Sequence, residues 1–267
     1  MNLFSAISPI HTIENGDVLA SIECCCTAHN TNAAITYKFY KHQPYIDLTV
    51  TIEYEEKNKL IRLKIPCPNG IVIGDGPYVV EEKPTCGEIS FQKWLGVKTS
   101  SGKIFSVIND GVYGGKAENG SLYMTLLRGA GYCIHPIGER KPYPTDRYLP
   151  RIEGGRYEMN FRIYCENVSA VCRMAEQFNQ PPYALNVFPI GGKKVAPLIQ
   201  TNKPVSMPVC KIEKDGYTLR FFNPDETTEQ FSLQIAQKTA SVTLKPYEIV
   251  TVKVGADDIQ VFSDKIL

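Results

Sequence analysis

The sequence predicts an all-β protein, in which a large antiparallel β-sandwich with one short helix is followed by a small C-terminal β-sandwich. Apolar and polar residues alternate along most of the chain, which is the pattern of strands that bury one face. Short segments of turn-forming residues separate these runs, as in antiparallel sheets. The 43% hydrophobic and 21% charged residues are typical of a globular chain.

The alternation is clearest in three segments near the N-terminus. ITYKFY (35–40), YIDLTVTIEY (45–54) and LIRLKIP (60–66) are rich in Thr, Val, Ile and Tyr, which favour strands. The turn-forming segments HQP and EKNK separate them. Further strands are expected at 78–82, 88–97, 104–109, 121–128 and 156–165, and in the C-terminal part within 209–224, 229–236, 240–246 and 248–254.

One stretch has the periodicity of a helix. From Val168 onward, apolar residues recur at intervals of three and four, which places them on one helical face. Asn167 or Ser169 is expected to cap the start of this helix. Pro181 and Pro182 are expected to end it, because proline cannot continue the hydrogen-bond pattern.

We expect the chain to divide into three regions. Residues 1–180 form the main antiparallel β-sandwich domain, and residues 181–208 form an extended linker rich in Pro and Gly. Residues 209–267 form a small C-terminal β domain. Because this last region is too short for a sizeable core, it is expected to pack on the first.

Charge and cysteine usage narrow the partners and the compartment. The net charge is +1 and Lys and Arg form no dense run, so neither nucleic acid nor an anionic membrane surface is expected as a partner. No apolar run approaches the roughly 20 residues that cross a bilayer. Nine cysteines are an odd number, and the adjacent Cys24, Cys25 and Cys26 suit a strand better than cross-links. Free thiols favour a cytoplasmic location.

The sequence lacks the motifs of a self-contained catalytic centre. Its four histidines do not form the HxH or HxxxH spacing of a metal site, and there is no CxxC pair. A GxSxG segment, which would mark an activated serine, is also missing. Cys133 lies two residues before His135, but nothing in the sequence indicates a thiolate. We therefore expect no catalytic residue and no metal ligand in this chain.

Residues 104–129 allow two interpretations. Asn109-Asp110-Gly111 has the chemistry of a turn, because Asn and Asp bond nearby backbone and Gly is conformationally free. Alternatively, this segment borders a binding site in which Asp110 and Arg128 hold a polar ligand. The next stretch, 129–157, is rich in Tyr and Arg. It is either a loop that contacts sugars or another domain, or an ordinary connection between strands.

Taken in order, several segments resemble the C-terminal β region of the glycoside hydrolase family 38 α-mannosidases. The most specific is SVINDGVYGGKAENGSLYMTLLRG (106–129), which is similar to the family's "Leu-Leu-Asn-Asp-x-x-Tyr-Gly … Leu-x-Leu-Leu-Arg" hairpin. PYIDLTVTIEYEEKNKLIRLKIPCP (44–68) and FQKWLGV (91–97) resemble two further elements. The sequence departs from the family pattern at Gln92 and Tyr157, where the family usually has histidine.

The resemblance implies a galactose-mutarotase-like super-sandwich and a role beside an active site. In this family the zinc ion and the nucleophilic Asp belong to an N-terminal α/β barrel, so this chain is expected to begin inside the β region and to hold no cofactor itself. Its expected partners are that catalytic domain and, through the parent enzyme, α-mannosides. Arg128, with Asp110 as the weaker partner, is the candidate for sugar contact.

Two other functions remain open. A stand-alone carbohydrate-binding module would use the Tyr- and Arg-rich loop at 132–157. A sugar epimerase would need an acid and a base facing one ring carbon, for which only His135 with Glu139 or Glu153 are available. In all cases we expect a homo-oligomer, because a truncated sandwich exposes sheet edges and apolar surface.

Overall fold

The computed structural model describes residues 4–131, 152–184, 197–235 and 237–264. Within these residues the chain forms antiparallel sheets and a single helix, α1 (Val168–Asn179), so the predicted all-β class with one helix is confirmed. Cys133, His135 and Glu139 lie outside the described residues. None of the described helical residues form a segment long and apolar enough to cross a membrane.

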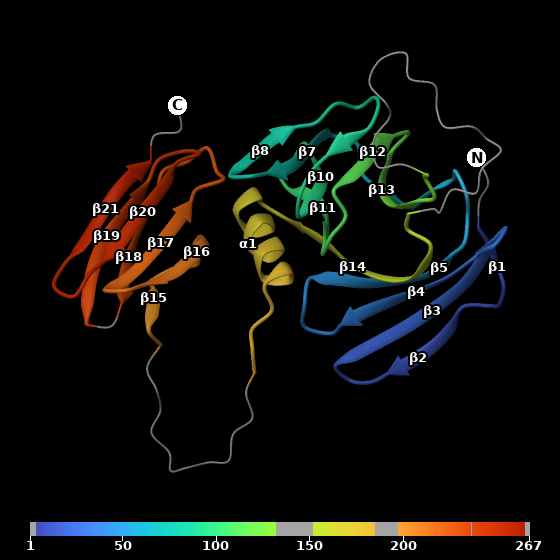
Figure 1. The fold of residues 1–267 in the computed structure, drawn as a ribbon, viewed down its shortest axis with the longest axis horizontal. Coiled ribbons are helices and arrows are strands. Elements are labelled where there is room, and N and C mark those ends of the chain that lie inside the picture. Colours follow the sequence, from blue (N-terminus) through green and yellow to red (C-terminus); the bar gives the residue numbers. More distant parts are fainter. Residues whose placement is uncertain (1–3, 132–151, 185–196, 236, 265–267) are drawn as a thin grey trace, which may run out of the picture.

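A ten-stranded antiparallel sheet forms one layer of the main sandwich (Figure 1). Its strands follow the order β1-β3-β4-β5-β14-β11-β10-β7-β8, and β2 pairs beside β1 on the outer side of β3. In that order the bounds are β1 (Ser5–Ala6), β3 (Leu19–Ala28), β4 (Thr31–Tyr40), β5 (Tyr45–Tyr54), β14 (Gly155–Glu166), β11 (Ile104–Asn109), β10 (Trp94–Lys98), β7 (Ile71–Gly76) and β8 (Val79–Glu82), with β2 at His11–Asn15.

A four-stranded sheet packs on one face of the large sheet. It consists of β6 (Leu60–Pro66), β13 (Ser121–Arg128), β12 (Gly114–Glu118) and β9 (Ile89–Ser90), in that order. Every second residue of β5, from Leu48 to Tyr54, is buried between the two sheets. The alternation that predicted the strands therefore builds the core, because side chains at positions i and i+2 share one face.

Helix α1 covers the opposite face of the large sheet. Its buried residues Val171, Cys172 and Ala175 pack on Trp94 of β10 and, among others, Ile108 of β11. The side chain of Asn167 accepts a hydrogen bond from the backbone N–H of Ala170, so Asn167 and not Ser169 is the cap. The helix ends at Asn179, just before the predicted Pro-Pro stop.

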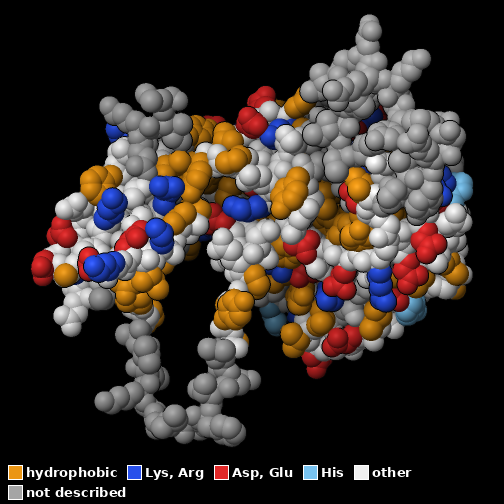
Figure 2. All heavy atoms as spheres, in the orientation of Figure 1, with side chains coloured by type: hydrophobic (Ala, Val, Ile, Leu, Met, Phe, Trp, Pro, Cys, Tyr) orange, Lys and Arg blue, Asp and Glu red, His pale blue; other side chains and the backbone are white. Residues whose placement is uncertain are grey.

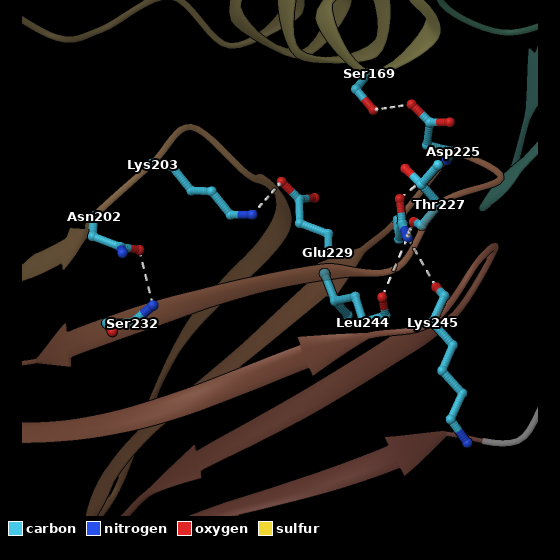
Figure 3. Close-up of polar contacts among 10 residues, drawn as sticks. Ser169, Asn202, Lys203, Asp225, Thr227, Glu229, Ser232, Leu244 and Lys245 are labelled. Carbon is cyan, nitrogen blue, oxygen red and sulfur yellow. Dashed lines mark hydrogen bonds and ion pairs between the residues drawn. The ribbon is translucent and has the colours of Figure 1, made fainter.

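The C-terminal part is a second, smaller sandwich. One sheet contains β15 (Ile199–Thr201), β18 (Glu229–Ile235) and β19 (Lys238–Leu244), and the other contains β16 (Ser206–Glu213), β17 (Gly216–Phe222), β20 (Ile249–Val254) and β21 (Ile259–Asp264). Strand β15 and the start of β16 lie where the sequence predicted only a linker. Polar contacts hold this segment on β18: Asn202 with Ser232 and Lys203 with Glu229 (Figure 3).

The two sandwiches are joined by contacts through α1 and by one direct contact between aromatic rings. The hydroxyl of Ser206 donates to Glu176 at 2.6 Å. The hydroxyl of Ser169 donates to Asp225 at 3.3 Å (Figure 3). The rings of Tyr78 and Phe222 meet edge to face with centroids 5.9 Å apart. The small domain therefore packs on the large one, with α1 between them (Figure 1).

The described residues show mixed charges on the surface and free cysteines. On the face drawn in Figure 2, both basic and acidic side chains appear on each of the two sandwiches. The cysteines of the described residues, including the adjacent Cys24, Cys25 and Cys26 in β3, are all free thiols. A cytoplasmic location stays a prediction.

Candidate functional site

The turn after β11 uses its polar residues to fix the chain. The buried side-chain oxygen of Asn109 accepts hydrogen bonds from the backbone N–H groups of Gly111 at 2.9 Å and Val112 at 2.6 Å. The exposed carboxylate of Asp110 accepts from the backbone N–H of Asn160 at 3.1 Å and from its side-chain amide at 2.9 Å. These contacts support the turn interpretation, since Asn109 bonds the backbone of the turn itself and Asp110 ties the turn to Asn160 of β14.

Arg128 lies at the end of β13, with an exposed side chain. Its backbone N–H donates to the carboxylate of Glu153, which precedes β14 and has a positive φ of 64°. The backbone of this exposed residue is therefore fixed by a charge-assisted hydrogen bond. Contact between Arg128 and a sugar stays a prediction.

The backbone around Arg128 is part of a close-packed group that we call the Arg128 rim; its members are Tyr54, Glu56, Lys59, Arg128, Gly129 and Glu153. The N–H of Gly129 donates to the carbonyl of Lys59 at 2.9 Å. The hydroxyl of Tyr54 donates to the same carbonyl at 2.8 Å. Two loops of the main sandwich, after β5 and after β13, are thereby locked together at the base of Arg128.

Two pKa shifts reflect this packing. Burial of the Tyr54 ring raises the pKa of its hydroxyl above the usual value. The pKa of Glu56 is lowered, mainly by the Lys59 ammonium at 2.8 Å and also by the backbone N–H of Asn30. Both groups therefore have one protonation state near neutral pH, Tyr54 neutral and Glu56 charged, and serve as fixed hydrogen-bonding groups rather than proton carriers.

Asp110 is anchored on β14, and Arg128 is anchored on the segment that precedes this strand. Asp110 bonds Asn160, whereas the backbone of Arg128 bonds Glu153, which precedes the first residue of the strand, Gly155. A strand rises about 3.3 Å per residue, so Gly155 and Asn160 alone are roughly 16 Å apart. Asp110 and Arg128 therefore have different neighbours. A ligand that contacted both at once would have to span the distance between them.

A second polar region, which the sequence did not indicate, lies between the two sandwiches. A cavity of about 200 Å³ is lined by the β7–β8 turn, the start of β10, one face of α1 and parts of β16 and β17. We call it the junction cavity; the residues that matter most are Asp75, Tyr78, Lys93, Trp94, Glu176 and Phe222.

Asp75 is buried, with 6% of its surface exposed. One carboxylate oxygen, Oδ1, accepts hydrogen bonds from the backbone N–H groups of Gln92, Lys93 and Trp94 at 3.2, 2.9 and 3.0 Å. These bonds fix the segment that leads into β10. Burial raises the pKa of Asp75 even though the three N–H groups and the Lys93 charge act in the opposite direction.

Glu176 faces the same cavity from α1. Its Oε1 accepts the hydroxyl of Ser206 at 2.6 Å, and burial raises its pKa despite that hydrogen bond and the nearby Lys93. The negative charge of Asp75 acts on Glu176 in the same direction as burial. The thiol of Cys172, which lines the same cavity, has its pKa raised to about 12 by burial, so it is protonated and not a nucleophile.

The indole of Trp94 completes the junction cavity. Trp94 is fully buried, yet its Nε1–H has no hydrogen-bond partner among the described residues. The indole lies against the Cys172 thiol, but this contact lacks hydrogen-bond geometry and sulfur is a weak acceptor. A buried N–H without a partner is rare and costly, so it calls for an explanation.

Neither region fits a metal. Among the described residues, no group of three or more His, Cys, Asp or Glu side chains is placed to hold a metal ion. The zinc that the family resemblance implies therefore has no ligand set in the described part of this chain.

Comparisons with known proteins match this fold to part of a larger architecture. The sequence matches no protein-family description and no curated protein. The structure is similar to a glycosyl hydrolase family 38 protein from Enterococcus faecalis, with a TM-score of 0.76 and 16% identity over 94% of this chain and 36% of that one. It is also similar to an α-mannosidase from Enterococcus faecalis V583, with a TM-score of 0.74 and 15% identity over 94% of this chain and 35% of that one.

These similarities confirm the fold that the sequence resemblance implied. Nearly the whole chain superimposes on structures of glycoside hydrolase family 38. The chain spans about a third of the length of those structures. What they share with this chain is the fold, since the identities are low.

Proposed function

We propose that this chain is the β-sandwich part of an α-mannosidase of glycoside hydrolase family 38 and that it shapes the carbohydrate pocket of a separate catalytic barrel. The observation that carries the proposal is the structural match, which takes in 94% of this chain and 36% of a family 38 protein. Zinc and the nucleophilic carboxylate belong to the barrel in this proposal.

The role of this chain is to position groups at the edge of the pocket. Arg128 is the residue we assign to sugar contact, because its side chain is exposed while its backbone is fixed in the Arg128 rim. A guanidinium bonds two neighbouring hydroxyls or a carboxylate with defined geometry. Asp110 is the weaker candidate, since its carboxylate already accepts two hydrogen bonds from Asn160.

The test is to isolate the tagged chain from the cells that produce it and to identify what accompanies it. We expect an α/β-barrel polypeptide, joined to the chain or bound to it, and hydrolysis of an aryl α-mannoside by the isolated species. The 267-residue chain by itself is expected to give no hydrolysis. Turnover by the purified chain alone would refute the proposal. So would mannose-specific binding by the chain without any barrel, provided that Asp75→Asn in the junction cavity leaves this binding unchanged; that result would favour a stand-alone carbohydrate-binding module.

The Arg128 assignment is tested in the active species. Arg128→Ala is expected to lower kcat/KM about tenfold or more, because a charged hydrogen bond to substrate contributes about 1.5–3 kcal/mol. Lys253→Ala removes an exposed positive charge from β20 of the other sandwich and is the matched control. Equal kcat/KM values for the two variants would remove Arg128 from the site.

A further inference from the structure

The junction cavity contains three polar groups that the fold buries without using fully. Asp75 bonds the chain through Oδ1, and Oδ2 has no partner among the described residues. Glu176 bonds Ser206 through Oε1, and its Oε2 is likewise without a partner there. The Nε1–H of the fully buried Trp94 is the third group. The residues that carry these two acceptors and one donor line the same space, together with Lys93.

The charges around this space exclude most ligand classes. An anion would meet the carboxylates of Asp75 and Glu176. A metal ion would find only these two hard ligands and would be repelled by Lys93, which acts electrostatically on both carboxyls. A ligand made only of donors would leave the Trp94 N–H without an acceptor. Hydroxyl groups satisfy all three groups, because each hydroxyl both donates and accepts.

The size and walls of the cavity narrow the ligand further. Its volume of about 200 Å³ is below the roughly 300–1,000 Å³ of pockets for drug-sized ligands. Tyr78 and Phe222 supply aromatic surface, and their edge-to-face contact holds both rings in place. Aromatic surface beside carboxylates suits a small molecule that has both C–H faces and hydroxyl edges.

We infer that the junction cavity binds a neutral polyol of about monosaccharide size, whose hydroxyls bond Asp75 Oδ2, Glu176 Oε2 and Trp94 Nε1. This site is separate from the Arg128 rim and does not depend on the proposed function. Because its walls come from the main sandwich, α1 and the C-terminal sandwich, an occupant bonds elements from both domains. Binding is therefore expected to raise the thermal stability of the whole chain.

The chain contains a single tryptophan, and it is the one in the cavity. Tryptophan fluorescence of the 267-residue protein thus reports occupancy directly. We would titrate the protein with D-mannose, D-glucose and myo-inositol, and with magnesium chloride and sodium phosphate as probes for the excluded classes. The expected result is a saturable change with at least one polyol at millimolar concentration and none with the two salts.

Variants connect the signal to the named atoms. Asp75→Asn keeps the Oδ1 acceptor but replaces the charged Oδ2 acceptor with a neutral donor, and Glu176→Gln does the same on α1. Each variant loses a charge-assisted hydrogen bond from the polyol and is expected to weaken binding roughly tenfold or more. Glu118→Gln, at the exposed end of β12 in the opposite sheet, is the matched control and should leave binding unchanged. Arg128→Ala should also leave it unchanged, which separates this site from the proposed function. Asp75→Asn and Glu176→Gln are both measured, so the test still stands if one of them fails to fold. The unfolding midpoint of each variant shows whether it is folded.

The inference is overturned by any of three results. The first is no saturable fluorescence change with the three polyols. The second is polyol binding that survives both Asp75→Asn and Glu176→Gln in folded protein. The third is a response to magnesium or phosphate that exceeds the response to every polyol.

Discussion

Gly129 shows how one residue without a side chain lets the Arg128 rim form. A Cβ atom at this position would lie 2.1 Å from the backbone oxygen of Glu56 and 2.7 Å from the hydroxyl of Tyr54. Both neighbours are fixed, the first as backbone and the second by its hydrogen bond to Lys59. The loops after β5 and β13 therefore approach as closely as they do only because residue 129 is glycine.

Gly129→Ala is expected to destabilise the protein by about 1–3 kcal/mol, since the added methyl forces the two loops apart. Gly111→Ala is the matched control, because a Cβ at Gly111 meets nothing within 4 Å. The free energies of unfolding from urea denaturation check both variants. Equal stabilities would mean that the loops separate at no cost and that the rim is not a rigid base for Arg128.

The two carboxyls of the junction cavity make stability depend on pH. Burial raises the pKa of Asp75 above its ordinary 3.8 and that of Glu176 above its ordinary 4.5. The folded chain then binds protons more tightly than the unfolded chain at these sites. As pH rises from these ordinary values through the raised ones, the free energy of unfolding falls, because protons leave the unfolded state first.

The double variant Asp75→Asn/Glu176→Gln removes these two titrations. Relative to wild type, its free energy of unfolding is expected to increase as pH rises above about 4, since only the wild type loses the stability contributed by the two buried carboxylic acids. Urea denaturation at several pH values measures the difference. A difference that is flat with pH, or that falls, would show that the cavity does not raise these pKa values.

At the scale of elements, α1 is short but contacts both sandwiches. Its buried face packs on the large sheet, and Ser169 and Glu176 on other faces bond the C-terminal sandwich. The helix is capped only by the side chain of Asn167 at its N-terminus, and its first turn carries no acidic residue. Loss of the cap therefore weakens the element that both domains share.

Asn167→Ala is expected to lower the free energy of unfolding by about 1 kcal/mol, the usual contribution of an N-cap side chain. Asn167→Ser keeps an oxygen acceptor for the Ala170 N–H and is expected to restore most of the loss. Chemical denaturation followed by circular dichroism measures both. If alanine and serine are equally destabilising, something other than the cap explains the effect.

Elements with regular alternation could be predicted from the sequence, and elements rich in glycine could not. β5 and β6 have the predicted bounds, because alternate residues enter one core. The stretch IVIGDG of β7 lacks alternation, since this strand is buried on both faces where α1 covers the sheet. β12 contains Gly114 and Gly115, whose lack of side chains hides the pattern. Both strands were therefore missed.

The Arg128 rim and the junction cavity also differ in how far the sequence could predict them. Arg128 and the turn at Asp110 follow strands in sequence, so their motif could be read from the chain. Asp75 and Glu176 are 101 residues apart in the sequence and line one cavity only because α1 packs over the end of β7. The available signal was a carboxylate within an apolar strand and another beside the apolar face of a helix. Neither points to a partner without the tertiary structure.

At the scale of the whole molecule, the sheet that builds the core also leaves an apolar edge. β2 is an outer strand, and the surrounding Ile7, Ile10, Ile13 and Val18 are 54–70% exposed. A register shift at Ile13 interrupts the pairing of β2 with β3. Bulges of this kind hinder edge-to-edge hydrogen bonding between sheets. Association at this edge is therefore expected to use apolar side chains rather than a continuous sheet.

The isolated chain is accordingly expected to form a dimer or a larger species through this edge, with the concentration dependence measured by analytical ultracentrifugation. Ile13→Lys places a charge in the apolar surface and is expected to weaken self-association about tenfold or more. Ile212→Lys makes the same change on β16 of the other sandwich, where Ile212 is 79% exposed, and should leave the association unchanged. A strictly monomeric wild type would refute the oligomer. Disruption by Ile212→Lys but not by Ile13→Lys would move the contact to the C-terminal sandwich, and the exposed residues around β2 would then remain available to the catalytic barrel.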